Sequence, residues 1–175
     1  SSGILLPVSS LPSPYGIGGF GDAAYEFVDF LVAAGQKYWQ MLPLGPTSYG
    51  DSPYQSFSTF AGNPYFIDLG RLVDEGLLSA ADTDIFWGDD PEKVDYGQLY
   101  QNRYTVLRKA YENAKAQPAR MERLAAFSLE NTAWLGDYAL FMALKDHFSG
   151  HPWTEWPRAL RLREPEALAA YGAEL

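Results

Sequence analysis

One strand-helix-strand pattern opens the sequence, and it does not recur within the 175 residues. Residues 4–8 form an apolar run that predicts a buried strand, and residues 38–44 form a second run of the kind that is covered on both faces. Between them, apolar residues recur at helical spacing, with Asp22 at the expected N-cap and Gly35 at the expected stop. This order predicts two parallel strands joined by a helix.

The rest of the sequence is mainly helical in pattern. Helices are expected over residues 95–116, where Asp95 is the cap, and over residues 118–130 and 133–148. A complete (β/α)8 barrel takes about 250 residues, so this chain is too short to close one. We therefore expect the α/β class, with residues 1–69 as the first strands and helix of an incomplete TIM barrel and residues 70–175 as a mainly helical insertion subdomain. A small α+β domain that only begins like a barrel is the alternative.

The composition indicates which binding partners and which cellular compartment to expect for this chain. Thirteen basic residues against twenty-two acidic ones give a formal charge of −9, which repels polyanions, so nucleic acid is not an expected partner. Cysteine is absent, which leaves no disulfide framework and no thiolate for zinc or catalysis, so a cytoplasmic location is expected. The sequence has no apolar stretch of membrane-spanning length and no signal-peptide pattern at its start, so no membrane partner is expected.

Residues 45–62 form a long segment rich in Gly, Pro, Ser and Tyr that follows the second predicted strand, and we call it loop 45–62. Connections of this length tend to be functional, and barrel sites lie at the carboxyl ends of strands. The loop combines hydroxyls, an amide, one carboxylate and tyrosines, the mixture that sugar rings and vicinal hydroxyls need. Successive turns with tyrosines that cover the core would explain the same composition.

Other candidate sites are weaker. Asp51 is the lone carboxylate of the loop and cannot supply a catalytic pair, so a turn with a possible sugar contact is the favoured role. The acidic cluster at residues 82–92 lacks the alternation of a calcium loop and is interpreted as a solvated connection. His147 and His151 are separated by the helix break at Gly150, so no metal site is expected. The glycines of residues 16–21 match a dinucleotide-binding fingerprint only superficially.

Several longer segments carry a specific resemblance. They occur in order along nearly the whole chain, at residues 10–18, 38–47, 50–58, 60–65, 94–97 and 137–145. Together they resemble the amylomaltase, or disproportionating-enzyme, family of 4-α-glucanotransferases. The resemblance implies a retaining enzyme without a cofactor, which cuts an α-1,4 bond, holds a covalent glycosyl intermediate and passes it to the 4-hydroxyl of another sugar. In that family the catalytic carboxylates come from later barrel strands, so no catalytic residue is expected within these 175 residues.

The resemblance also implies which residues bind substrate. It assigns Ser52 and Tyr54 to the wall of the active-site cleft beside the donor sugar, with Asp51 and Gln55 as neighbours. Two further aromatic positions, Tyr49 and Tyr100, correspond to a second glucan groove away from the cleft, although Tyr100 also fits an ordinary helix stripe.

The expected partners are α-1,4-glucans, maltooligosaccharides and the remainder of the same polypeptide. The chain is interpreted as the amino-terminal fragment of a 4-α-glucanotransferase, and by itself it is expected to be inactive because a retaining reaction needs two carboxyl groups. The alternatives are a non-catalytic α-glucan-binding module, an interaction domain, or part of a hydrolase related to α-amylase.

Overall fold

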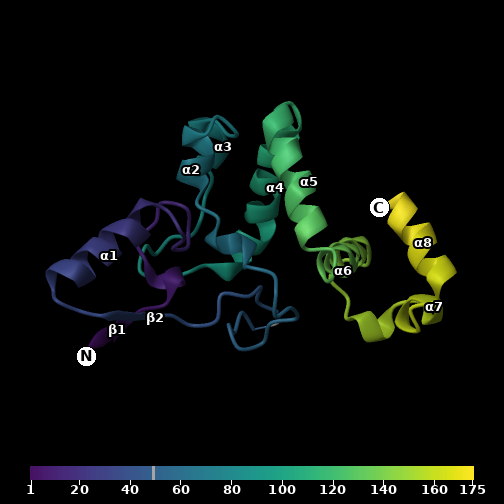
Figure 1. The fold of residues 1–175 in the computed structure, drawn as a ribbon, viewed down its shortest axis with the longest axis horizontal. Coiled ribbons are helices and arrows are strands. Elements are labelled where there is room, and N and C mark those ends of the chain that lie inside the picture. The colour runs from purple at the N-terminus through teal and green to yellow at the C-terminus, as the bar shows by residue number, and fades with distance from the viewer. Residues whose placement is uncertain (49) are drawn as a thin grey trace. The chain divides into compact units, whose positions relative to one another are not determined.

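The computed structural model describes residues 1–48 and 50–175. The chain forms two compact units, Ser1–Met121 and Glu122–Leu175, which are described separately. Figure 1 traces the order of their helices and strands along the chain. Among the described residues, no helix is both long and apolar enough to span a membrane.

The predicted strand-helix-strand unit is present but its strands are short. Strand β1 (Gly3–Leu5) pairs in parallel with β2 (Tyr38–Gln40), and Gly3 lies opposite Tyr38 (Figure 1). Strand β1 ends earlier than expected because Pro7 has no N–H to donate to a sheet, and β2 ends at Gln40, which pairs with the last residue of β1. Beyond β1 the chain turns into the short 3-10 helix η1 (Val8–Ser10), and beyond β2 residues 41–44 are irregular.

The sheet is not covered on both faces, contrary to the expectation from its hydrophobicity. Leu5 and Tyr38 are exposed, and within the described part of the chain β1 and β2 pair only with each other. The connecting helix α1 (Asp22–Ala33) likewise exposes Phe30 and Val32, the latter to 72%. Large apolar side chains on an open sheet edge and a neighbouring helix are the features of a surface that other parts of a protein cover.

Helix α1 begins one residue earlier than predicted. Asp22 is its first residue and Gly21 is the N-cap, a position without room for a side chain because a Cβ at Gly21 would lie only 2.2 Å from Oδ2 of Asp68. The predicted stop is confirmed, because Gly35 follows the helix with a φ of 66°, a left-handed conformation that glycine adopts readily.

The remaining helices follow in sequence order. The first unit adds η2 (Pro64–Phe66), α2 (Leu69–Asp74), α3 (Ala80–Thr83) and α4 (Tyr96–Lys115), and α5 (Pro118–Glu130) crosses into the second unit. The second unit continues with α6 (Leu135–His147), η3 (Trp153–Glu155), α7 (Arg158–Arg161) and α8 (Pro165–Glu174). The three long helices confirm the predicted ones to within two residues, and Asp95 caps α4 by accepting a hydrogen bond from the N–H of Gln98.

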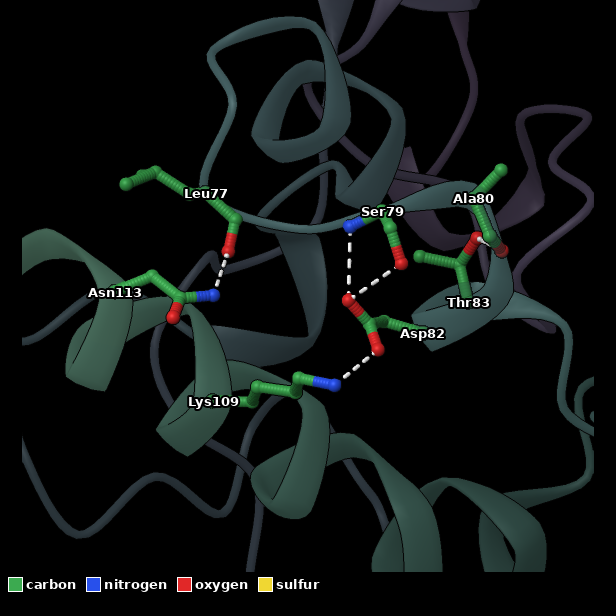
Figure 2. Close-up of polar contacts among 7 residues, drawn as sticks. All are labelled: Leu77, Ser79, Ala80, Asp82, Thr83, Lys109 and Asn113. Atoms are coloured by element: carbon green, nitrogen blue, oxygen red, sulfur yellow. Dashed lines mark hydrogen bonds and ion pairs between the residues drawn. The ribbon is translucent and has the colours of Figure 1, made fainter.

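Helix α3 is tied to α4 by a small polar cluster. Asp82 accepts hydrogen bonds from the N–H and hydroxyl of Ser79 at 2.8 Å each and pairs with Lys109 of α4 (Figure 2). The side-chain amide of Asn113 donates to the carbonyl of Leu77 at 2.8 Å. Asp82 is therefore the third residue of a capping box with Ser79 as the N-cap, and it has a cationic partner in Lys109, so it does not belong to a solvated connection, as the acidic run had suggested.

The main core of the first unit joins segments from both sides of residue 69. Leu69 of α2 and Leu99 of α4 are completely buried, and Ile17, Trp87 and Val106 pack in the same cluster. A smaller cluster lies around Val8, Leu11 and Ala24, with Trp39 of β2 packed against it. The separation of residues 1–69 from 70–175 as barrel and insertion thus stays a prediction about a complete barrel, whereas within this chain the compact unit extends to Met121.

The second unit has a core of its own. Leu144, Trp156 and Leu160 are buried together, and Phe141, Phe148 and Tyr171 pack against them. Arg163 forms a bidentate ion pair with Asp137 at 2.9 and 3.0 Å near the edge of this cluster.

Candidate functional site

A cavity of about 200 Å³ lies at the carboxyl ends of the two parallel strands. Its walls come from four places, namely the segment after β1, the segment after β2, loop 45–62 with the residues that follow it, and the start of α4. The lining residues are Pro7, Val8, Ser9, Ile17, Leu42, Pro43, Leu44, Thr47, Asp51, Pro53, Asn63, Phe66 and Tyr96. Strand ends, hydroxyls, one amide and two aromatic rings therefore meet around one hollow.

The ends of loop 45–62 are joined by a hydrogen bond at the rim of this cavity. The N–H of Asn63 donates to the carbonyl of Leu44 at 2.8 Å, and the Asn63 side chain accepts from the N–H of Tyr65 at 3.0 Å. Inside the loop, the hydroxyl of Ser56 donates to the carbonyl of Ser58 at 2.7 Å. A Cβ at Gly45 would lie 2.7 Å from Oγ of Ser56, so the loop folds back closely on its own beginning.

Asp51 enters the cavity from a tight turn. Its N–H donates to the carbonyl of Ser48 at 3.1 Å, and both Gly50 and Asp51 have positive φ angles, of 82° and 54°. Aspartate is one of the few residues that adopts this left-handed conformation without great cost. The predicted turn role of Asp51 agrees with this backbone, and its carboxylate also lines the hollow.

The carboxylate of Asp51 lies in a partly desolvated, phenol-rich environment. Burial raises the pKa of Asp51 above its ordinary value. Burial also raises the pKa of Tyr96, and the charge of Asp51 adds to that rise. Burial raises the pKa of Tyr65 to about 12, with further contributions from Tyr104 and Asp51. A carboxylate acceptor beside phenol donors is suited to binding a polyhydroxylated ligand.

The other predicted loop residues, Ser52, Tyr54 and Gln55, are not among the residues that line the cavity, although Ser52 lies between Asp51 and Pro53, which do line it. Ser52 is half-buried, and its hydroxyl accepts a hydrogen bond from the N–H of Tyr54 at 3.3 Å. The ring of Tyr54 is 73% exposed, and Gln55 is exposed beside it. Neither Ser52 nor Tyr54 is enclosed in a core, so both side chains are accessible to a ligand. Their assignment as sugar contacts stays a prediction.

Helix α4 presents three tyrosines at intervals of four residues, Tyr96, Tyr100 and Tyr104. Residues four apart lie on one face of a helix, so the three form a stripe. Tyr96 lines the cavity, Tyr100 is 69% exposed, and the ring of Tyr104 lies 6.1 Å from that of Tyr65. The prediction for Tyr100 is compatible with this exposure, whereas Tyr49 lies outside the described residues.

Sequence reasoning missed several residues that line the cavity. Asn63, Phe66 and Tyr96 all occur in the family-like segments or beside them, but none was singled out. The four-residue spacing of the α4 tyrosines was the available signal for Tyr96. Asp51 is the one carboxylate among the lining residues, and the described part of the chain contains no group of three His, Cys, Asp or Glu residues suited to a metal ion.

Two parallel strands joined by a helix, with a hollow at their carboxyl ends, place the molecule among the α/β proteins. More specifically, a model of the 4-alpha-glucanotransferase family matches residues 6–175, and the chain belongs to this family.

Individual relatives agree with this membership. The 4-alpha-glucanotransferase of Clostridium butyricum is 52% identical over 97% of this chain, and that of Streptococcus pneumoniae is 49% identical over 99% of it. The solved structure of the amylomaltase from Streptococcus agalactiae in complex with acarbose is 48% identical over 99% of this chain, with a TM-score of 0.95. The chain spans about a third of the length of these relatives, 35% in each case.

Proposed function

We propose that this chain supplies the amino-terminal part of a 4-α-glucanotransferase that moves α-1,4-glucan segments between maltooligosaccharides. In this proposal β1, α1 and β2 begin a (β/α)8 barrel, and the helices after residue 69 form an insertion beside the cleft. The cavity that loop 45–62 lines at the strand ends is the observation that carries the proposal, because barrel enzymes bind their substrates at that end of the strands. Close identity to named glucanotransferases supports the same reaction.

The proposed reaction is a retaining glycosyl transfer. A carboxylate displaces the glycosidic oxygen from the anomeric carbon while a second carboxyl group protonates that oxygen, and the two groups stand about 5–5.5 Å apart. The 4-hydroxyl of an acceptor sugar then attacks the glycosyl ester, and its proton passes to the second carboxyl group. Asp51 is the one carboxylate among the residues that line the cavity, so in this proposal the catalytic pair comes from the remainder of the polypeptide. We therefore propose that the chain alone binds glucan but does not transfer it.

Within this reaction the residues of the chain bind and orient the donor. Ser52 and Tyr54 would form the cleft wall. Asp51 would accept hydrogen bonds from sugar hydroxyls, and the amide of Gln55 would accept from them or donate to them. Tyr49 and Tyr100 would hold a second stretch of glucan. Acarbose, which the Streptococcus agalactiae amylomaltase binds, is a suitable second ligand for testing these roles.

Two proteins test whether glucan transfer needs the remainder of the polypeptide. The 175-residue chain and the same chain extended by its own downstream coding sequence are each incubated with maltotriose, and products are separated by length. The extended protein should yield both longer and shorter maltooligosaccharides, whereas the chain alone should yield none. Longer products from the chain alone would contradict the proposal.

Binding is tested separately by hydrogen exchange of the chain with maltoheptaose. The amides of loop 45–62 should become protected, and Tyr54→Ala should weaken binding because it removes an exposed aromatic platform. Tyr25→Ala, which removes an exposed tyrosine from α1, is the control and should bind normally. A loop that gains no protection at saturating sugar would favour an interaction domain.

The proposal includes a cytoplasmic location, since the sequence contains no cysteine with which to form disulfides in an oxidising compartment. In the cytoplasm the substrates of the enzyme would be α-1,4-glucans and maltooligosaccharides.

A further inference from the structure

Arg103 is a buried cation in the middle of helix α4. It is 1% exposed, although arginine is almost never fully buried unless its charge is paired. Its guanidinium donates to the carbonyl of Tyr65 at 2.9 Å, to the carbonyl of Ile67, and at 3.5 Å to the carbonyl of Tyr15. The guanidinium carbon also lies 5.7 Å from the ring centre of Trp87. One side chain of α4 thus holds two segments that are 36 to 88 residues away in sequence.

The guanidinium keeps its charge at neutral pH despite this environment. Burial lowers the pKa of Arg103 to about 10, and the nearby charge of Asp68 opposes the change. Hydrogen bonds from a charged donor are stronger than those between neutral groups. The contacts to the Tyr65 and Ile67 carbonyls are therefore strong restraints on the segment between them.

Residues 65–67 form one wall of the cavity at the strand ends. Phe66 lies between the two restrained carbonyls and lines the hollow, and its own carbonyl accepts a hydrogen bond from the N–H of Phe20 at 3.0 Å. Asn63, two residues before Tyr65, also lines the hollow and closes the base of loop 45–62 through Leu44. Displacement of residues 63–67 would move this wall and the base of the loop together.

A second part of the lining comes from the same helix as Arg103. Tyr96 lines the cavity from the first turn of α4, seven residues before Arg103, which is about two helical turns. The helix between them is anchored by Leu99, which is fully buried. Helix α4 carries Tyr96 and also binds residues 65–67 through Arg103. A rigid helix therefore sets the distance between Tyr96 and the part of the lining that Phe66 forms.

We propose that Arg103 is a positioning residue for glucan binding, which holds the Tyr96 wall of the cavity at a set distance from the wall formed by Asn63 and Phe66. This inference rests on the proposed function, since it concerns the same cavity. A hydrophobic residue would fill the space of Arg103 without donating to any carbonyl, and a lysine would present a compact charge that cannot span several acceptors in one plane.

The test compares Arg103→Met, Arg103→Lys and the control Arg108→Met, an exposed arginine of the same helix. Each chain is titrated with maltoheptaose, its thermal unfolding is recorded, and amide exchange is measured without sugar. Arg103→Met should bind about tenfold more weakly or worse, a change of about 1.4 kcal/mol, and its amides in residues 45–67 should exchange faster. Arg103→Lys should fall between that variant and the wild type, and Arg108→Met should bind maltoheptaose as the wild type does.

The outcomes separate this inference from the proposed function. A wild-type chain that does not bind maltoheptaose would refute the proposed function and the inference with it. Wild-type binding together with unchanged affinity and loop exchange in folded Arg103→Met would refute the inference alone, because Arg103 would then serve only stability. If Arg103→Met does not fold, Arg103→Lys decides the matter: weaker binding at a retained melting temperature supports positioning, and unchanged binding overturns it.

Discussion

Asp51 illustrates how one side chain can serve a turn and a ligand at once. Its left-handed backbone closes the turn after Gly50, while its carboxylate lines the cavity beside Tyr96. The two roles can be separated, because asparagine tolerates the same backbone conformation but carries no charge.

We predict that Asp51→Asn weakens maltoheptaose binding by about five- to tenfold, since hydrogen bonds to a charged acceptor contribute about 1 kcal/mol more than neutral ones. Thermal stability should change little. Calorimetric titration and thermal unfolding of the variant check both statements, with Asp89→Asn as an exposed control. Wild-type affinity in Asp51→Asn would leave the turn as its only role.

Asp82 makes the stability of the first unit depend on acid. Its hydrogen bonds from Lys109 and Ser79 lower its pKa from 3.8 to about 2 (Figure 2). Because the folded pKa lies below the ordinary value, the ionised carboxylate stabilises the fold fully above about pH 3.8, and this contribution is lost as the pH falls towards 2.

Denaturant unfolding between about pH 5 and pH 2 tests this linkage. We expect Asp82→Asn to be less stable than the wild type at the upper end, with the difference shrinking towards the lower end. Asp89→Asn, in the same acidic run, should parallel the wild type throughout. A constant difference between Asp82→Asn and wild type would argue against the assigned pKa.

At the scale of elements, helix α4 connects the site to the core of the first unit. It contributes the cavity tyrosine Tyr96, the buried Leu99 and the carbonyl-binding Arg103, and it begins at the side-chain cap Asp95. Fraying of its first turn would therefore affect the wall of the cavity directly.

We predict that Asp95→Ala lowers the unfolding free energy by about 1 kcal/mol, because the N–H of Gln98 loses its side-chain acceptor. Asp95→Asn keeps an acceptor oxygen and should retain most of the stability. Chemical denaturation of both variants measures the effect, and amide exchange at Gly97 and Gln98 localises it. Equal stability of the two variants would show that the cap is not needed.

For the whole molecule, separate cores predict separate responses to cavity-forming substitutions. Leu99 is fully buried in the first unit, and Trp156 is buried in the second with Leu144 and Leu160. Removal of a large buried side chain costs about 2–5 kcal/mol.

We expect Leu99→Ala to lose amide protection throughout residues 1–121 while the protection of α6 and α8 is retained. Trp156→Ala should produce the reverse pattern. Native-state hydrogen exchange read by mass spectrometry distinguishes the two, and uniform loss of protection in either variant would mean that the chain unfolds as one cooperative body.

Local patterns in the sequence predicted much of this molecule. The order of strand, helix and strand, the three long helices, the cap at Asp95 and the stop at Gly35 all follow from spacing and end residues, which act within a few positions along the chain. The family also followed from the sequence, because ordered motifs extend over nearly its whole length. The strand lengths did not follow, since the hydrophobic runs continued past Leu5 and Gln40, where the pairing ends.

The cavity was decided by tertiary structure. Loop 45–62 could be predicted to bear ligand-binding groups, but Asn63, Phe66 and Tyr96 line the same hollow only because the tertiary fold brings their segments together. Helical spacing puts Arg103 on the same stripe as Leu99 and Ala110, but the acceptors that allow a cation to be buried there, such as the carbonyl of Tyr65, lie far from it along the chain. Periodicity and capping report forces between near neighbours, whereas the placement of a buried cation against distant backbone acceptors depends on the assembled core.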